Sequence, residues 1–217
     1  GLFKVNKKKK SNYKLKLSDK VFYPHSFSID KKDKKNLEKL YKKQIENLFQ
    51  SIIYEDNNIL VLNKANGLAV QGGSKISFNI DIALPYLTKK KNALKLTHRI
   101  DRHTSGILIL AKTKKIAKEM TSLFKNNKVC KTYWAITVNA PKKEQDVIIS
   151  PLKKKLINGI EKVVVDPKSE KKAKTKYKVL EKKKGLALIE VYPQTGRTHQ
   201  IRVHLLEIKA PILGDKK

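Results

Sequence analysis

The arginine residues of this chain fall in two short segments where chemistry is expected. Lysine and arginine together number 50, yet only four of these residues are arginine. They are Arg99, Arg102, Arg197 and Arg202. Segments 97–106 and 195–204 contain two each, no lysine, and four of the five histidines. Because lysine cannot copy a planar, bidentate guanidinium, a lysine-rich chain that uses arginine here indicates positions at which geometry matters.

Asp101 is the first candidate for a catalytic group. It lies between Arg99 and Arg102, just before the apolar run 106–111. A carboxylate beside guanidinium groups stays ionised, which suits a nucleophile better than a general acid. A purely structural Asp–Arg pair is the alternative that these residues alone leave open.

The second segment could bring another guanidinium to the same pocket. Gly196 predicts a turn into a helix that starts near Thr198. His199 and Arg202 are three residues apart, so they would share one face of that helix. The two segments together favour a catalytic Asp101 over a structural one.

Apolar periodicity predicts the elements that position these segments. We expect a hairpin of strands 52–54 and 59–62, a glycine-containing loop 64–73, a helix 78–87, a strand 106–111, a helix from the N-cap Thr113 to Asn127, strands 129–138 and 186–192, and a last helix that turns Ile201, Leu205 and Ile208 inward. Strands in irregular order, with helices between them and without βαβ alternation, predict a mixed α+β sheet.

The first 50 residues are predicted to form separate parts. Residues 1–24 read as two short strands, Leu2–Val5 and Lys14–Phe22, around a lysine-rich turn. Residues 25–50 form a linker whose apolar positions recur at helical spacing. The main domain then spans 51–217.

Composition restricts the class of protein and its partners. The net charge of +31 predicts binding to a polyanion such as nucleic acid; compositional drift toward lysine is the alternative. Cys130, the only cysteine, is expected to be a small buried apolar residue. The sequence has neither a membrane-length apolar run nor a secretory leader, so we expect a cytoplasmic protein. The missing initiator methionine and the apolar residues near both ends predict a fragment.

Four stretches carry a resemblance to a known family. HRIDRHTSGILILAK (98–112) resembles the catalytic signature of the RluA-type pseudouridine synthases. KTYWAITV (131–138) and TGRTHQIRVHL (195–205) are similar to that family's next two motifs, and ILVLNKANGLAVQGG (59–73) to its opening hairpin and loop. The similarity covers about residues 51–215, with Ala65 in place of a usual proline and without the family's final segment. Residues 1–24 resemble the end of an S4 RNA-binding domain.

The resemblance implies an isomerase that converts uridine in RNA to pseudouridine. It also implies the family's α+β fold, a mixed, largely antiparallel sheet core with flanking helices. The loop 71–74 is most similar to that of the RluC branch, which implies large-subunit (23S) ribosomal RNA as the substrate. No cofactor or metal is implied, and the residues agree, since they offer no glycine-rich phosphate loop and no zinc set. We expect a monomer that binds RNA. It is expected to bind neither a membrane nor a small-molecule cofactor.

The resemblance also implies residue roles. Asp101 is the nucleophile that attacks the ribose or, in the competing glycal account, attacks after the C2′ proton has left. Tyr133 stacks on the uracil and is the candidate general base, and Arg202 pairs with Asp101. Arg99 would fill the space that the flipped target base leaves. Further RNA contacts are expected from Arg102, Arg197, His199 and Lys64.

Two other functions are compatible with parts of the sequence. A metal hydrolase would use the pairs His98/His103 and His199/His204, but residues five apart point away from one another on a helix, and no HExxH motif is present. A catalytically inert RNA-binding assembly factor would use the basic charge equally well; the complete set Asp101, Tyr133 and Arg202 argues against it. Ser105, His103 and Asp101 are too close in sequence for a hydrolase triad.

Overall fold

The computed structural model describes residues 4–5, 8–9, 21–22, 36, 39–72, 76–88, 94–170 and 172–215. The chain divides into two units, 1–46 and 47–217. In the first, β1 (Lys4–Val5), β2 (Lys8–Lys9) and β3 (Val21–Phe22) form an antiparallel sheet of order β2-β1-β3. Lys8–Lys9 is thus a short strand within the predicted lysine-rich turn. The rest of the two predicted strands lies outside the described residues, and the S4-like identity of 1–24 stays a prediction.

Helix α2 (Lys42–Gln50) leads into the second unit. It corresponds to the end of the predicted linker helix. Leu48 is buried in the core that begins there, whereas Phe49, also predicted on the apolar face, is exposed.

The first sheet of the second unit has the order β4-β5-β7-β6, with every neighbour antiparallel. Its strands are β4 (Ile52–Glu55), β5 (Ile59–Lys64), β6 (Lys95–Leu96) and β7 (Gly106–Ala111). The predicted hairpin and the strand at 106–111 are confirmed. Leu60, Leu62, Leu108 and Leu110 are buried on this sheet against α3 (Ile80–Ala83) and the 3₁₀ turn η1 (Leu84–Tyr86), the two short pieces that replace the predicted helix 78–87.

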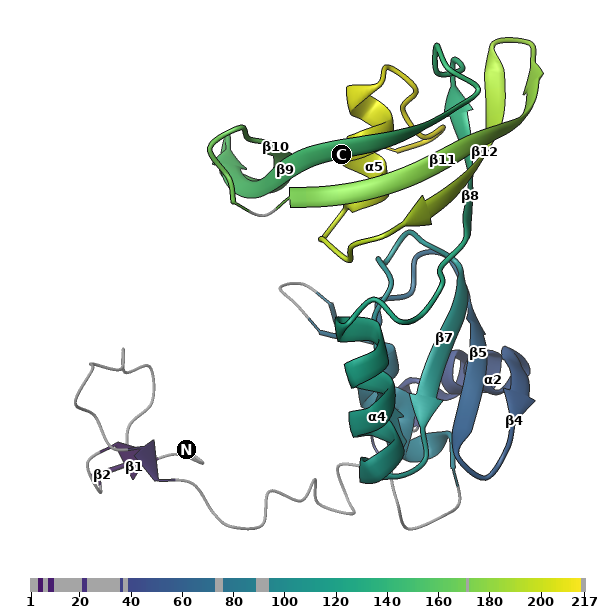
Figure 1. The fold of residues 1–217 in the computed structure, drawn as a ribbon. Helices are drawn as coiled ribbons and strands as arrows, with labels where there is room; N and C mark the ends of the chain where they lie inside the picture. Colours follow the sequence, from purple (N-terminus) through teal and green to yellow (C-terminus); the bar gives the residue numbers. More distant parts are fainter. Residues whose placement is uncertain are drawn as a thin grey trace. The chain divides into compact units, whose positions relative to one another are not determined.

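Helix α4 (Lys114–Lys125) follows β7 and packs against it (Figure 1). The predicted N-cap is confirmed, because the Thr113 hydroxyl accepts a hydrogen bond from the Ile116 amide at 3.2 Å. The apolar residues Ile116, Ala117, Met120 and Phe124 of this helix are only half-buried, and Leu123 is exposed. Cys130, beyond this helix, is exposed rather than buried as predicted.

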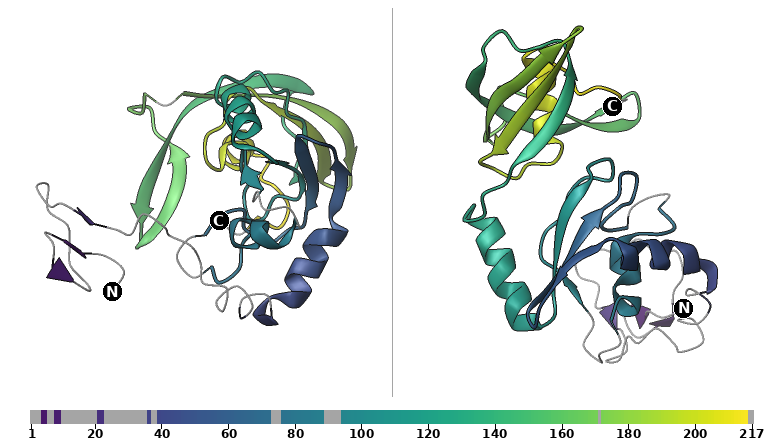
Figure 2. Two further views of the ribbon diagram at one scale, coloured as in Figure 1. Left: turned by 90° about the horizontal axis from the view of Figure 1, so that it is seen from below. Right: turned by 90° about the vertical axis from the view of Figure 1, so that its right-hand side faces the viewer.

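The second sheet has the order β10-β9-β11-β12-β8 and is antiparallel throughout. Its strands are β8 (Tyr133–Val138), β9 (Gln145–Ile157), β10 (Ile160–Val165), β11 (Lys172–Lys183) and β12 (Leu186–Pro193). Helix α5 (Gln200–Glu207) covers one face (Figures 1 and 2). Leu205 is buried there, while Ile201 and Ile208 pack at the edge of the same core, as predicted.

These elements confirm the predicted α+β class. The strand pairings are antiparallel, and a parallel bridge joins Ala69 to Asn79. Within the described part of the chain, no helix is both long and apolar enough to cross a membrane.

Candidate active site

Asp101 lies in the loop that joins β6 to β7. The start of this loop is fixed to β7 by two hydrogen bonds, from Thr97 Oγ1 to the Ile109 carbonyl at 2.7 Å and from the Ile109 amide to His98 Nε2 at 3.0 Å. The Thr104 amide then donates to the Asp101 carbonyl at 3.0 Å, which closes a turn. The Asp101 side chain is 34 % exposed, so a substrate can reach it.

His98 is a structural residue in this arrangement. Burial and the nearby Lys131 ammonium lower the pKa of His98 to about 4, so its ring is neutral at neutral pH. The ring stacks on Phe124 with centroids 4.1 Å apart. Since Nε2 accepts a backbone hydrogen bond, His98 holds the loop and takes no part in acid–base chemistry.

Lys64, at the end of β5, is fully buried beneath the same loop. Its Nζ donates to the carbonyls of Ala65 and Leu68, both at 2.9 Å, and of Arg102 at 3.2 Å. Burial lowers the pKa of Lys64 to about 8, against an opposing contribution from the Asp101 charge. The predicted RNA contact of Lys64 is therefore wrong. Its ammonium donates to three main-chain carbonyls and joins loop 65–68 to the loop that carries Asp101.

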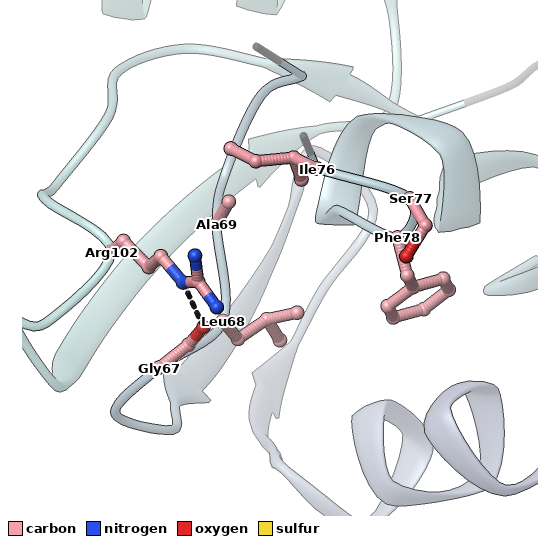
Figure 3. A pocket seen from close by; sticks show the side chains of 7 residues that line it. All are labelled: Gly67, Leu68, Ala69, Ile76, Ser77, Phe78 and Arg102. Carbon is pink, nitrogen blue, oxygen red and sulfur yellow. Dashed lines mark hydrogen bonds between the residues drawn. The ribbon is translucent and has the colours of Figure 1, made fainter. Parts of the chain in front are cut away.

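Arg102 holds these two loops together from the outside. Its Nε donates to the Gly67 carbonyl at 2.8 Å, while the Gly67 amide donates to the Arg102 carbonyl at 2.9 Å (Figure 3). The Arg102 side chain lines a pocket of about 240 Å³ together with segments 67–69 and 76–78. This volume lies below the roughly 300–1,000 Å³ of small-molecule sites. The other N–H groups of Arg102 have no protein acceptor in the described part of the chain, so they can bind an anion.

Tyr133 begins β8 and is half-buried. Burial raises the pKa of Tyr133, and the negative charge of Asp101 raises it further. A raised pKa keeps the hydroxyl protonated at neutral pH. The ring is thus available for stacking, but the predicted general base would have to work as a neutral hydroxyl.

His199, directly before α5 on the second sheet, comes close to Asp101. The distance between His199 Nε2 and Asp101 Oδ2 is 3.8 Å, too long for a direct hydrogen bond but suitable for an ion pair when the ring is protonated. His199 is the N-cap of α5 in the left-handed region, with φ 53° and ψ 20°. The backbone therefore turns at His199 rather than at Gly196, and His199 precedes the helix instead of sharing a helical face with Arg202. Left-handed backbone is uncommon for a residue with a side chain and is typical of functional sites.

Arg202 does not pair with Asp101 as predicted. Its Nε donates to Asp215 Oδ2 at 2.7 Å, and its Nη2 donates to Oδ1 of the same carboxylate. Asp215 follows a segment that pairs with the edge of β8, through Val138 N to Pro211 O and Leu213 N to Ile136 O, both at 2.8 Å. Since a bidentate fork satisfies one planar carboxylate, Arg202 fixes this segment beside β8.

Gln200, which the sequence analysis did not single out, organises the turn before α5. Its Oε1 accepts from Thr195 Oγ1 at 2.7 Å and from the Arg197 amide at 3.0 Å. Its Nε2 donates to the Lys174 carbonyl at 3.0 Å and to Thr175 Oγ1 at 2.8 Å. Four hydrogen bonds to a buried amide hold the turn that carries His199. The only signal in the sequence was its place between two predicted site residues.

The remaining predicted RNA contacts lie on the surface. Arg99 and Arg197 are exposed, and neither makes an ion pair within the described residues. Across the same residues, no group of three His, Cys, Asp or Glu side chains is placed to hold a metal ion.

The chemistry available here is that of a positioned nucleophile. A partly exposed carboxylate lies 3.8 Å from the imidazole before α5, and its charge acts on the ammonium of Lys64 in β5 and the hydroxyl of Tyr133 in β8. Such a carboxylate can attack an electrophilic carbon and form a covalent intermediate. The stacking ring and the exposed guanidinium groups suit a substrate with a flat base and phosphates.

Comparison with known proteins agrees with this chemistry. A family profile described as RNA pseudouridylate synthase matches residues 58–207. The chain is 39 % identical to "Ribosomal large subunit pseudouridine synthase C" of Vibrio parahaemolyticus, over 100 % of this chain and 68 % of that protein. It is 38 % identical to the protein of the same name in Rickettsia conorii, over 97 % and 71 %. The solved structure titled "Human RNA Pseudouridylate Synthase Domain Containing 4" superimposes with a TM-score of 0.69 at 35 % identity, covering 81 % of this chain and 71 % of that one.

Proposed function

The chain belongs to the RNA pseudouridylate synthase family, isomerases that convert uridine in RNA to pseudouridine, and we propose that its substrate is large-subunit ribosomal RNA. The names of the relatives at 38–39 % identity support this substrate. Family membership supports catalysis over the inert RNA-binding alternative. The ribosomal RNA substrate in the names of the relatives supports the predicted cytoplasmic location. Sedimentation of the chain tests the predicted monomer.

The observation that carries the proposal is the set of groups around the Asp101 carboxylate. Lys64, Tyr133 and His199 come from three distant parts of the chain and all lie within the electrostatic reach of Asp101. The carboxylate remains accessible, whereas Lys64 is buried. Such an arrangement suits a nucleophile whose loop is fixed by buried contacts while its carboxylate stays open to the substrate.

In the proposed reaction, an Asp101 oxygen bonds to C1′ of the target ribose as the bond from C1′ to N1 of uracil breaks. The electron pair of the broken bond leaves with the uracil. The uracil rotates within the site, C5 bonds to C1′, and the bond to Asp101 breaks, which regenerates the carboxylate. Loss of the C5 proton and gain of a proton at N1 then restore the aromatic ring, so the product is an isomer of uridine and atoms and charge balance without a co-reactant.

The other residues support these steps. Tyr133 would stack on the free uracil and retain it during rotation. Exposed Arg99 would occupy the space left in the RNA by the flipped nucleotide, and Arg102 and Arg197 would contact phosphates nearby. His199, when protonated, would keep the carboxylate in place.

Large-subunit rRNA transcribed in vitro, with uridine or 5-fluorouridine, tests the proposal. The chain should produce pseudouridine from the first RNA. From the second it should yield a stalled adduct or a rearranged fluorinated product, because fluorine cannot leave C5 as a cation. Asp101→Asn keeps the size of the side chain and should abolish both products while RNA affinity stays within a few-fold. Mass spectrometry of the recovered RNA detects both products. If the protein without substitutions leaves all nucleosides unchanged, the proposed function is refuted.

A further inference from the structure

A column of lysines lies on the face of the second sheet that α5 does not cover. In β11 the residues Ala173, Thr175, Tyr177 and Val179 are buried on the α5 side. The alternating positions are all exposed lysines: Lys172, Lys174, Lys176 and Lys178. Side chains on one face of a strand repeat every two residues, or about 6.8 Å, so the four ammonium groups follow a line of about 20 Å. No helix of the described chain lies over this face (Figures 1 and 2).

Two aromatic rings flank one side of this column. The strand register places Glu190 of β12 beside Lys178 and Tyr192 beside Lys176, and Trp134 of β8 beside Glu190. Trp134 Nε1 donates to Glu190 Oε1 at 3.2 Å, and the Tyr192 hydroxyl donates to Oε2. The Glu190 carboxylate thus accepts hydrogen bonds from both rings and fixes their positions. Trp134 is nevertheless 70 % exposed, an unusual state for the largest apolar side chain.

Aliphatic side chains flank the other side of the column. Val147 and Ile149 of β9 are the register partners of Lys176 and Lys174, and both are exposed. Across this face, the side chains are thus aromatic on β8 and β12, cationic on β11 and aliphatic on β9.

The four lysines are free of intramolecular ion pairs. Within the described residues, no carboxylate lies within 4 Å of their ammonium groups, whereas Lys154 pairs with Glu161 and Lys143 with Asp146 on the same sheet. The charge of this column is therefore available to an external anion.

We propose that this lysine–aromatic face (Trp134, Tyr192, Lys172, Lys174, Lys176 and Lys178) binds a single-stranded segment of RNA away from the target nucleotide. A single strand offers both phosphates to the lysines and unpaired bases to the flanking rings, which is the combination that sequence-tolerant single-strand sites use. A duplex hides its base faces and would use the lysines alone. The inference rests on the proposed function, because it takes the substrate to be RNA.

Trp134 makes the face directly observable because it is the only tryptophan of the chain. A 12-nucleotide oligouridylate should lower the acrylamide quenching constant of Trp134 fluorescence at least two-fold, and an RNA duplex of equal length should not. Changing Lys172, Lys174, Lys176 and Lys178 to Gln should weaken oligouridylate binding at least ten-fold and reduce the slope of log K against log salt by about 3, at roughly 0.7 per phosphate.

The matched control changes four other exposed lysines, Lys114, Lys115, Lys118 and Lys125 of α4, to Gln. It removes the same charge and should alter oligouridylate affinity less than three-fold. Equal losses in both variants would mean that net charge alone binds RNA, and this would overturn the proposal. Equal protection of Trp134 by duplex and single strand would overturn it as well. Circular dichroism melts of both variants establish that each is folded.

Conversion of large-subunit rRNA, measured in parallel, separates this inference from the proposed function. Pseudouridine formation without protection of Trp134 by oligouridylate would refute the RNA-binding face and leave the proposed function intact. Protection of Trp134 that depends on the β11 lysines, without any conversion, would refute the proposed function and support the face.

Discussion

The buried ammonium of Lys64 donates to the main-chain carbonyl of Arg102, the residue directly after Asp101. The same ammonium donates to Ala65 and Leu68, so one cation fixes the geometry of both loops at the site. The link replaces a predicted contact with RNA by a positioning role. It also makes the position of the loop around Asp101 dependent on the protonation state of Lys64.

Catalysis should therefore weaken as Lys64 loses its proton. The pKa of Lys64 is lowered to about 8 by burial, and a neutral amine has two N–H donors for three carbonyls and no charge opposite Asp101. We expect the single-turnover rate to fall as the pH rises through about 8. Stopped-time assays between pH of about 7 and 9.5 test this. A rate that stays flat across the range would contradict the positioning role.

Folding stability should change in the opposite direction over that window. A folded pKa below the unfolded value of 10.5 means that the unfolded chain binds more protons between about pH 8 and 10.5. The destabilising contribution of Lys64 is thus fully present below about pH 8 and is relieved as the pH rises toward 10.5. Lys64→Met should remove this pH dependence and lower the rate at least 100-fold at neutral pH. Urea melts of the wild type and Lys64→Met as a function of pH measure it.

Tyr133→Phe separates stacking from proton transfer. The substitution keeps the ring beside Asp101 and removes only the hydroxyl, whose raised pKa leaves it protonated at neutral pH. If the neutral hydroxyl assists loss of the C5 proton, turnover should fall about 10²–10⁴-fold. The isotope effect of 5-deuterated uridine should then increase, because that step becomes limiting. A Phe variant with wild-type turnover and isotope effect would restrict Tyr133 to stacking.

Gln200→Leu should loosen the turn that carries His199. It removes the partner of Thr195 Oγ1 and of the Arg197 amide, together with the two hydrogen bonds that Gln200 Nε2 donates to β11. We expect a loss of roughly 3 kcal/mol in the free energy of unfolding and at least a ten-fold drop in rate. Gln194→Leu makes the same change at an exposed position and serves as the control; both are compared by thermal melts and turnover. Equal effects of the two substitutions would show that the network around Gln200 is dispensable.

Elements with strong local signals were predictable from the sequence. The β4–β5 hairpin, β7 and the capped start of α4 each depend on apolar residues and a turn or cap within a few positions. Strands β9, β10 and β11 were missed. In β11 the buried positions include Ala173 and Thr175, which are weak apolar signals between lysines. The turn between β9 and β10 is Asn158-Gly159, both with positive φ, a hairpin signal that the surrounding lysines obscured.

The site was predictable in its members but less so in their pairings. Asp101 and His199 do come close together, and both lie in the two segments whose residue types are unusual for this lysine-rich chain. The partners of Lys64 are main-chain carbonyls, which no residue type reveals. The partner of Arg202 depends on where the segment after α5 lies, and this is set by tertiary pairing with β8.

A double-mutant cycle on Arg202 and Asp215 decides between the predicted partner of Arg202 and the observed one. The fork holds Asp215 and thereby the segment that pairs with β8, which begins with Tyr133. Arg202→Lys should be nearly as damaging to turnover as Arg202→Ala, since a point charge cannot satisfy both carboxylate oxygens. Asp215→Asn should cause a comparable loss. The double variant should lose little more than either single one, with a coupling energy of about 1–3 kcal/mol in melts. If Arg202 instead acted through Asp101, Asp215→Asn would leave the single-turnover rate unchanged and the effects of the two substitutions on stability would simply add.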